Sequence, residues 1–147
     1  MEMELKYLLP VIEEKLNNGQ SVKLSPMGTS MLPMLRQGTD AVVLSPVTGK
    51  LKKYDIPFYR RDNGKFVLHR IVEAGDTYSC MGDNQFVIER NVRHDQVIAY
   101  VSGFYRKDTY YNVNNPVYLL YCRVWYNTRR IRRFFKRAVN WIRRHVR

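Results

Sequence analysis

The chain has 147 residues, of which 45% are hydrophobic and 26% charged, and its formal net charge is +12. This length suits one folded domain with appended segments, and this balance of apolar and charged residues excludes a largely disordered chain. The charge is unevenly distributed, because no Asp or Glu follows Asp108 while ten Lys or Arg residues lie between Arg123 and Arg147.

Residues 1–19 are predicted to form an N-terminal amphipathic helix. Apolar residues recur there at helical spacing with polar residues between them, and Gly19 stands where a helix would end. The apolar positions are Leu5, Leu8, Leu9, Ile12 and Leu16. We expect this face to pack against the rest of the domain.

Residues 20–108 have the pattern of a small antiparallel β domain, with short apolar runs separated by Gly, Pro, Asn and Asp. The predicted strands cover residues 21–24, 41–44, 56–60, 66–72, 77–81 and 97–105. Asn63-Gly64 lies between two of these runs and favours a tight hairpin, since glycine accepts the positive backbone angles of such turns. This arrangement predicts that His69 lies on a strand.

Residues 109–147 are predicted to form a basic amphipathic C-terminal helix. Its apolar positions are Leu120, Val124, Ile131, Phe134, Phe135, Ala138, Val139, Ile142 and Val146, and nine Lys or Arg residues lie from Arg129 to Arg147. The apolar stripe could pack on its own domain or lie in a membrane interface, with the arginines facing anionic lipid. The composition favours an anionic membrane surface as the partner. Nucleic acid is an unlikely partner, because no recognised nucleic-acid motif accompanies the arginines.

Three short motifs in the β segment carry candidate chemistry. They read Met27-Gly28-Thr29-Ser30-Met31-Leu32-Pro33, then Leu68-His69-Arg70, then Gly82-Asp83-Asn84. A serine hydroxyl becomes a good nucleophile only beside a base that accepts its proton, and His69 is the candidate base for Ser30. Each residue alone suits an ordinary turn or core position, so the ordered set carries the prediction. Cys80 and Cys122 lack metal-ligand spacing, and we predict no metal and no other cofactor.

These motifs resemble the catalytic boxes of type I signal peptidases over roughly residues 22 to 103. In that family the nucleophilic Ser is followed by Met and, one residue later, by Pro. Residues 53–59 resemble the family's Gly-Asp-Ile-Val strand, with Tyr54 in place of the Gly. His69 stands at the position of the general base, where bacterial members usually have Lys and endoplasmic-reticulum members have His. Gly82-Asp83-Asn84 is similar to the last box.

The resemblance implies a mainly β, α+β fold with a small antiparallel, barrel-like core related to the LexA-like peptidases. It also implies roles: Ser30 attacks a peptide carbonyl, His69 takes the serine proton, and Asp83 orients the His69 ring, with Glu89 as the alternative acid. Relatives with Gly at the position of Gly28 use the backbone N–H of the nucleophile as oxyanion donor. The remaining candidates for oxyanion and substrate binding are Thr29, Met31 and Pro33.

The function predicted from the sequence is therefore a signal-peptidase-like serine endopeptidase that cleaves a precursor or leader peptide at a membrane surface. A self-cleaving LexA-like regulator is one alternative, disfavoured by His69 in place of Lys and by the lack of a helix-turn-helix pattern before residue 20. The other alternative is an inactive peptidase-like module that binds membrane or peptide. Because we find no secretory-signal pattern and no run of about 18 apolar residues, we expect a cytoplasmic protein or a peripheral one on the cytoplasmic face.

Overall fold

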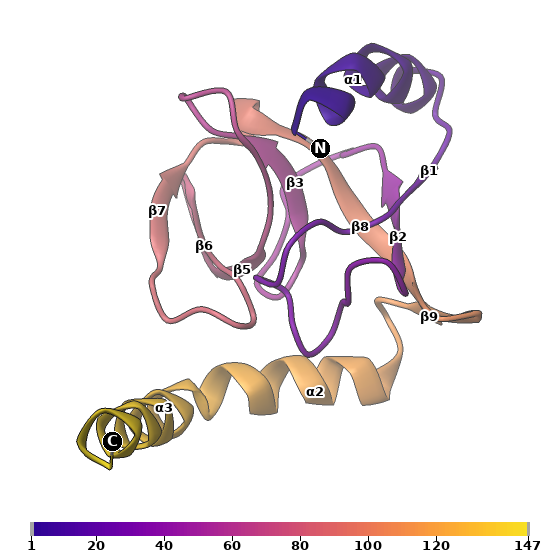
Figure 1. Ribbon diagram of the computed structural model, residues 1–147. Helices are drawn as coiled ribbons and strands as arrows, with labels where there is room; N and C mark the ends of the chain where they lie inside the picture. The colour runs from indigo at the N-terminus through magenta and orange to yellow at the C-terminus, as the bar shows by residue number, and fades with distance from the viewer. Residues whose placement is uncertain (1, 147) are drawn as a thin grey trace.

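The computed structural model describes residues 2–146 and has the predicted α+β fold (Figure 1). Its larger sheet has six strands, with the order β1-β2-β8-β3-β4 and with β9 paired to β8. These strands are β1 (Val22–Leu24), β2 (Ala41–Ser45), β3 (Pro57–Arg60), β4 (Phe66–Leu68), β8 (Val97–Arg106) and β9 (Thr109–Asn112). All of the pairings are antiparallel, and β8 joins three neighbours because it is the longest strand.

A smaller three-stranded sheet follows, formed by β5 (Arg70–Ala74), β6 (Tyr78–Met81) and β7 (Glu89–Val92). The strands therefore lie in two sheets, and among residues 2–146 they do not form a closed barrel. The predicted strand 66–72 is also wrong as one element, because β4 pairs with β3 whereas β5 pairs with β6. His69 is the single residue between β4 and β5, so it lies at the crossing between the two sheets and not on a strand.

The predicted hairpin at Asn63-Gly64 is confirmed. It joins β3 to β4, and the Arg61 N–H donates to the Lys65 carbonyl at 2.8 Å. Gly64 has a φ of +85°, a backbone conformation that costs glycine little and other residues more. The hairpin thereby sets the register that brings β4 and His69 to the edge of the larger sheet.

The N-terminal helix α1 (Glu2–Asn17) packs on the larger sheet through Leu5, Ile12 and Leu16, as its spacing predicts. The same core contains Val42 and Phe58 from the sheet. Each buried side chain of this size contributes roughly 1.5–3 kcal/mol to folding relative to an exposed one. This core holds α1 against the sheet beside β3, because Leu5 and Phe58 belong to the same buried cluster.

The C-terminal segment forms two helices, α2 (Pro116–Asn127) and α3 (Arg129–His145), and not the single helix that the sequence predicts. The Asn115 side chain caps α2 by accepting the N–H groups of Val117 and Tyr118, and Pro116 occupies its first position. Residues 109–112 belong to the larger sheet as β9, so the sheet extends past the predicted boundary at residue 108. Figure 1 shows α2 running beneath both sheets and α3 continuing beyond it in a different direction.

The helices α2 and α3 differ in how many of their residues are buried. α2 buries Tyr118 and Cys122, whereas α3 has no buried residue. The predicted stripe residues on α2, Leu120 and Val124, are 61% and 52% exposed, so packing on the protein's own domain leaves the predicted stripe exposed on both helices. Over residues 2–146 no helix combines the length and the apolar character needed to cross a bilayer.

Candidate active site

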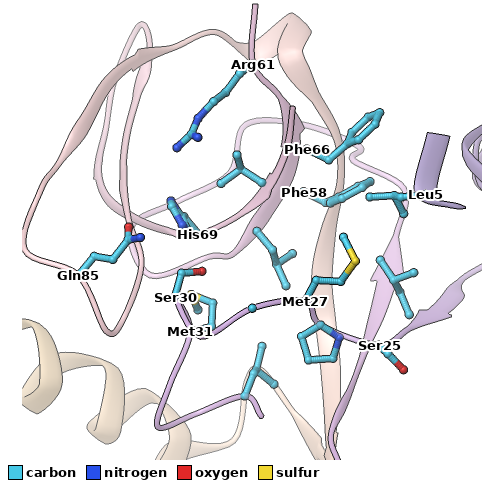
Figure 2. Close-up of a pocket in the computed structure, with 16 residues that line it drawn as sticks. Leu5, Ser25, Met27, Ser30, Met31, Phe58, Arg61, Phe66, His69 and Gln85 are labelled. Carbon is cyan, nitrogen blue, oxygen red and sulfur yellow. The ribbon is translucent and has the colours of Figure 1, made fainter. Parts of the chain in front are cut away.

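A cleft of about 260 Å³ opens between the segment after β1 and the strand β4 (Figure 2). Ser30 and His69 both line it, although 38 residues separate them in the chain. The other lining residues are mainly apolar: Leu5, Leu24, Ser25, Pro26, Met27, Gly28, Met31, Leu35, Phe58, Arg61, Phe66, Val67, Leu68 and Gln85. The cleft lining contains no carboxylate side chain, so the two candidate catalytic groups face a mostly apolar space.

Ser30 lies in a turn that covers residues 28–34. Gly28 begins this turn with a φ of +73°, and its N–H donates to the Gln37 side chain at 2.9 Å. Met31 and Met34 are buried and fix the turn to the core. Among residues 2–146 the Ser30 N–H has no hydrogen-bond acceptor.

Of the other predicted binding residues, the structure places Gly28 and Met31 at the cleft, whereas Thr29 and Pro33 are not part of its lining. Pro33 lines a separate apolar pocket beside α2, together with Met34 and Tyr121. The Thr29 carbonyl instead accepts the side-chain amide of Asn84 at 3.2 Å. Thr29 and Pro33 therefore lie in the nucleophile turn without facing the cleft.

His69 is 6% exposed, and its Nδ1 has no hydrogen-bond partner among the described residues. Burial, reinforced by the positive charge of Arg61, lowers the pKa of His69 to about 4. This low pKa keeps the imidazole neutral over the physiological pH range, and it also makes the ring a weaker base than an exposed histidine. Figure 2 shows Ser30 and His69 in the same part of the cleft, with no direct hydrogen bond between their side chains in the described structure. Such bonds commonly tighten only when substrate binds.

The structure gives Asp83 a different partner from the one predicted. Its carboxylate receives two hydrogen bonds from the Arg70 guanidinium, both at 2.8 Å, and a third from the Tyr121 hydroxyl at 3.0 Å. Both members of this ion pair are 3% exposed. Asp83 makes no hydrogen bond to His69 and acts on it only as a nearby negative charge, an influence that burial outweighs.

Glu89, the alternative acid, also forms its hydrogen bonds with residues other than His69. It accepts the Tyr59 hydroxyl at 2.7 Å and two N–H groups of Arg61 at 2.8 and 2.9 Å. Burial alone would raise the pKa of Glu89, but these hydrogen bonds lower it below the ordinary value. Neither predicted acid is thus hydrogen-bonded to the imidazole, and His69 Nδ1 has no partner among the described residues.

The Gly82-Asp83-Asn84 motif instead holds the nucleophile turn in place. The Asn84 N–H donates to the Ser30 carbonyl at 2.8 Å. A Cβ at position 82 would lie 2.6 Å from that same carbonyl oxygen, which explains why glycine occupies the position. This motif therefore fixes the backbone at Ser30.

Sequence reasoning missed the partners that hold this motif. Arg70 follows His69 directly, and a buried arginine requires a buried acid, but nothing in the sequence shows that this position is buried. The roles of Tyr121 and Trp125 have no local signal, because they depend on how α2 docks.

Within the described chain no group of three or more His, Cys, Asp or Glu side chains is arranged to hold a metal ion. Cys80 and Cys122 are buried free thiols. Comparisons of the chain with protein-family models, with curated proteins and with solved structures found no match.

Proposed function

We propose that this protein is a serine endopeptidase in which Ser30 is the nucleophile and His69 the general base. The observation that carries the proposal is that these two side chains, far apart in the chain, line the same mostly apolar cleft. The order of the motifs, which resembles that of type I signal peptidases, favours a precursor or leader peptide as substrate.

In the proposed reaction, the Ser30 hydroxyl attacks a peptide carbonyl and transfers its proton to His69. The Ser30 N–H donates to the oxyanion that forms. The imidazolium then returns the proton to the leaving amine, which departs with its peptide and leaves an ester on Ser30. A water molecule, deprotonated by the same imidazole, hydrolyses the ester and restores both groups.

The proposal is tested by digesting a synthetic peptide library with the purified full-length protein and identifying the products by mass spectrometry. Wild type is expected to give defined new termini, Ser30→Ala to give none, and Ser25→Ala to match wild type. Ser25 is a suitable control because it lines the same cleft. Cleavage that persists in Ser30→Ala, or no cleavage by any variant, would overturn the peptidase proposal.

The pH dependence of the reaction follows from the burial of His69. The imidazole works as a base only when neutral, so kcat/KM is expected to be constant from pH 7 down to about 5 and to fall as the pH passes through about 4. An exposed histidine would place this fall near pH 6.5. The measurement is kcat/KM against pH, with circular dichroism to establish the range over which the protein is folded. A fall centred near pH 6.5 would contradict a buried base.

We further propose that α3 holds the peptidase on an anionic membrane surface. Its aromatic residues are largely exposed, with Phe134 at 68% and Trp141 at 62%, and no acidic residue lies on the helix. Exposed apolar side chains beside arginines match the interface of an anionic bilayer. The cytoplasmic leaflet carries most of the anionic lipid in cells, which favours that face as the site of action.

Liposome flotation tests this placement. Full-length protein is expected to float with vesicles that contain phosphatidylserine, and to float less as the salt concentration rises. The double variant Phe134→Gln with Trp141→Gln is expected to bind at least about tenfold more weakly, because it loses two apolar side chains from the interface. The control is Tyr7→Gln, which changes an exposed aromatic residue on α1. Equal binding by wild type and the double variant would refute the role of α3.

A further inference from the structure

Helix α2 makes two hydrogen bonds to Asp83, which lies in the loop after β6. Tyr121 donates to the Asp83 side chain at 3.0 Å, and the indole N–H of Trp125 donates to the Asp83 carbonyl at 2.8 Å. Both residues lie on α2, one helical turn apart, and their rings stack on each other. One residue of the loop is thus held from the helix through both its side chain and its main chain.

The same helix also contacts the cation that neutralises Asp83. Arg70 donates to the Tyr118 hydroxyl at 2.8 Å and to the Tyr54 carbonyl at 3.1 Å, in addition to its two bonds to Asp83. Its side chain is buried, as is that of Tyr118. Because Arg70 follows His69 directly in the chain, this network begins next to the proposed base.

The network ends next to the proposed nucleophile. Asn84 follows Asp83, and it donates its backbone N–H to the Ser30 carbonyl and its side-chain amide to the Thr29 carbonyl. Gly82, on the other side of Asp83, packs directly against the Ser30 carbonyl. A displacement of Asp83 would therefore move the backbone of Ser30, and with it the Ser30 hydroxyl and N–H.

From these contacts we infer that α2 is part of the catalytic apparatus, with Tyr121 and Trp125 as positioning residues for Ser30. The catalytic part of this inference rests on the proposed peptidase function. The structural part, that α2 holds Asp83 and its neighbours in place, does not depend on it. A helix that merely covered the core would bury apolar side chains, but it would not need to donate to both the side chain and the carbonyl of one residue. Positioning matters because a misplacement of about 1 Å can cost a reaction about a hundredfold.

The chain supplies a matched control on the same helix. Tyr126 packs against Tyr54 through its ring, and its hydroxyl forms no hydrogen bond within residues 2–146. Replacing it with phenylalanine removes the same hydroxyl as Tyr121→Phe does, but without touching Asp83. Trp125→Phe likewise keeps an aromatic ring while removing the indole N–H.

The experiment measures two quantities on full-length wild type, Tyr126→Phe and the double variant Tyr121→Phe with Trp125→Phe. The first is the labelling rate with a fluorophosphonate probe, resolved into kinact and KI. The second is amide hydrogen exchange in residues 28–32 and 82–85. We expect the double variant to have a kinact about ten- to a hundredfold lower with KI little changed, and faster exchange at the Asn84 N–H. Tyr126→Phe should match wild type in both.

The outcomes separate the inference from the function on which it rests. If wild type labels at Ser30 and the double variant matches it in kinact and in Asn84 exchange, the positioning role is refuted while the peptidase proposal stands. A double variant that loses labelling only in proportion to a loss of folded protein, as measured by circular dichroism, also refutes it. If wild type does not label, the peptidase proposal fails, and the claim that α2 belongs to a catalytic apparatus is overturned with it.

Discussion

Replacing His69 with alanine is expected to lower the rate of Ser30 acylation by about 10² to 10⁴-fold. No other histidine lines the cleft, and Arg61, the cation that does, remains protonated and cannot accept a proton. The rate is measured as release of product in the burst phase, or as fluorophosphonate labelling, at pH 7. We expect the residual rate to lose the fall near pH 4 that the wild type should show.

The control for this prediction is His94→Ala. His94 stacks on Tyr78 and lies outside the cleft, so its replacement should leave the acylation rate within about twofold of wild type. Equal rates for His69→Ala and wild type would show that another group, or water alone, removes the serine proton. That result would contradict the proposed role of the imidazole.

Replacing Asp83 with asparagine is expected to lower the free energy of unfolding by about 3–5 kcal/mol, because it leaves the Arg70 cation buried without its counter-charge. The measurement is urea denaturation at pH 7. The matched control is Asp62→Asn, which breaks the exposed ion pair with Arg93 and should cost no more than about 1 kcal/mol.

A double variant separates the cost of an unpaired charge from the cost of lost packing. Arg70→Met with Asp83→Leu removes both charges, and it is expected to be more stable than Asp83→Asn alone. If Asp83→Asn instead keeps full stability while the activity falls and the pH profile shifts, the carboxylate acts on the imidazole. The sequence-based role of Asp83 would then hold against the contacts in the structure.

Much of the fold follows from local signals in the sequence. Helix α1 was predictable because its leucines recur at helical spacing, and the β3–β4 hairpin because Asn63-Gly64 suits a tight turn. The split at His69 was not predictable, because the apolar run 66–72 is continuous and only the pairing partners divide it between two sheets. Strand β9, which forms a hairpin with the preceding strand β8, and the break at Thr128, whose hydroxyl donates to the Val124 carbonyl at 2.7 Å, are local features that were not predicted from the sequence.

The candidate site divides in a similar way. The pairing of Ser30 with His69 could be proposed from the order of the motifs, and the structure brings both to one cleft. The role of Asp83 could not be derived, because a carboxylate near both a histidine and an arginine can serve either one, and only geometry decides. In the structure the Asp83 carboxylate pairs with Arg70, through two hydrogen bonds of 2.8 Å. The contacts from α2 were missed because they join residues 38 and 42 positions apart in the chain.

The most direct test of the central claim is to locate the adduct of a fluorophosphonate probe by peptide mass mapping of the full-length protein. We expect a single phosphonylated residue, Ser30, formed at a rate that depends on a neutral His69. An adduct on Ser25, the other serine of the cleft, or no adduct on any serine under conditions where the protein is folded, would contradict it.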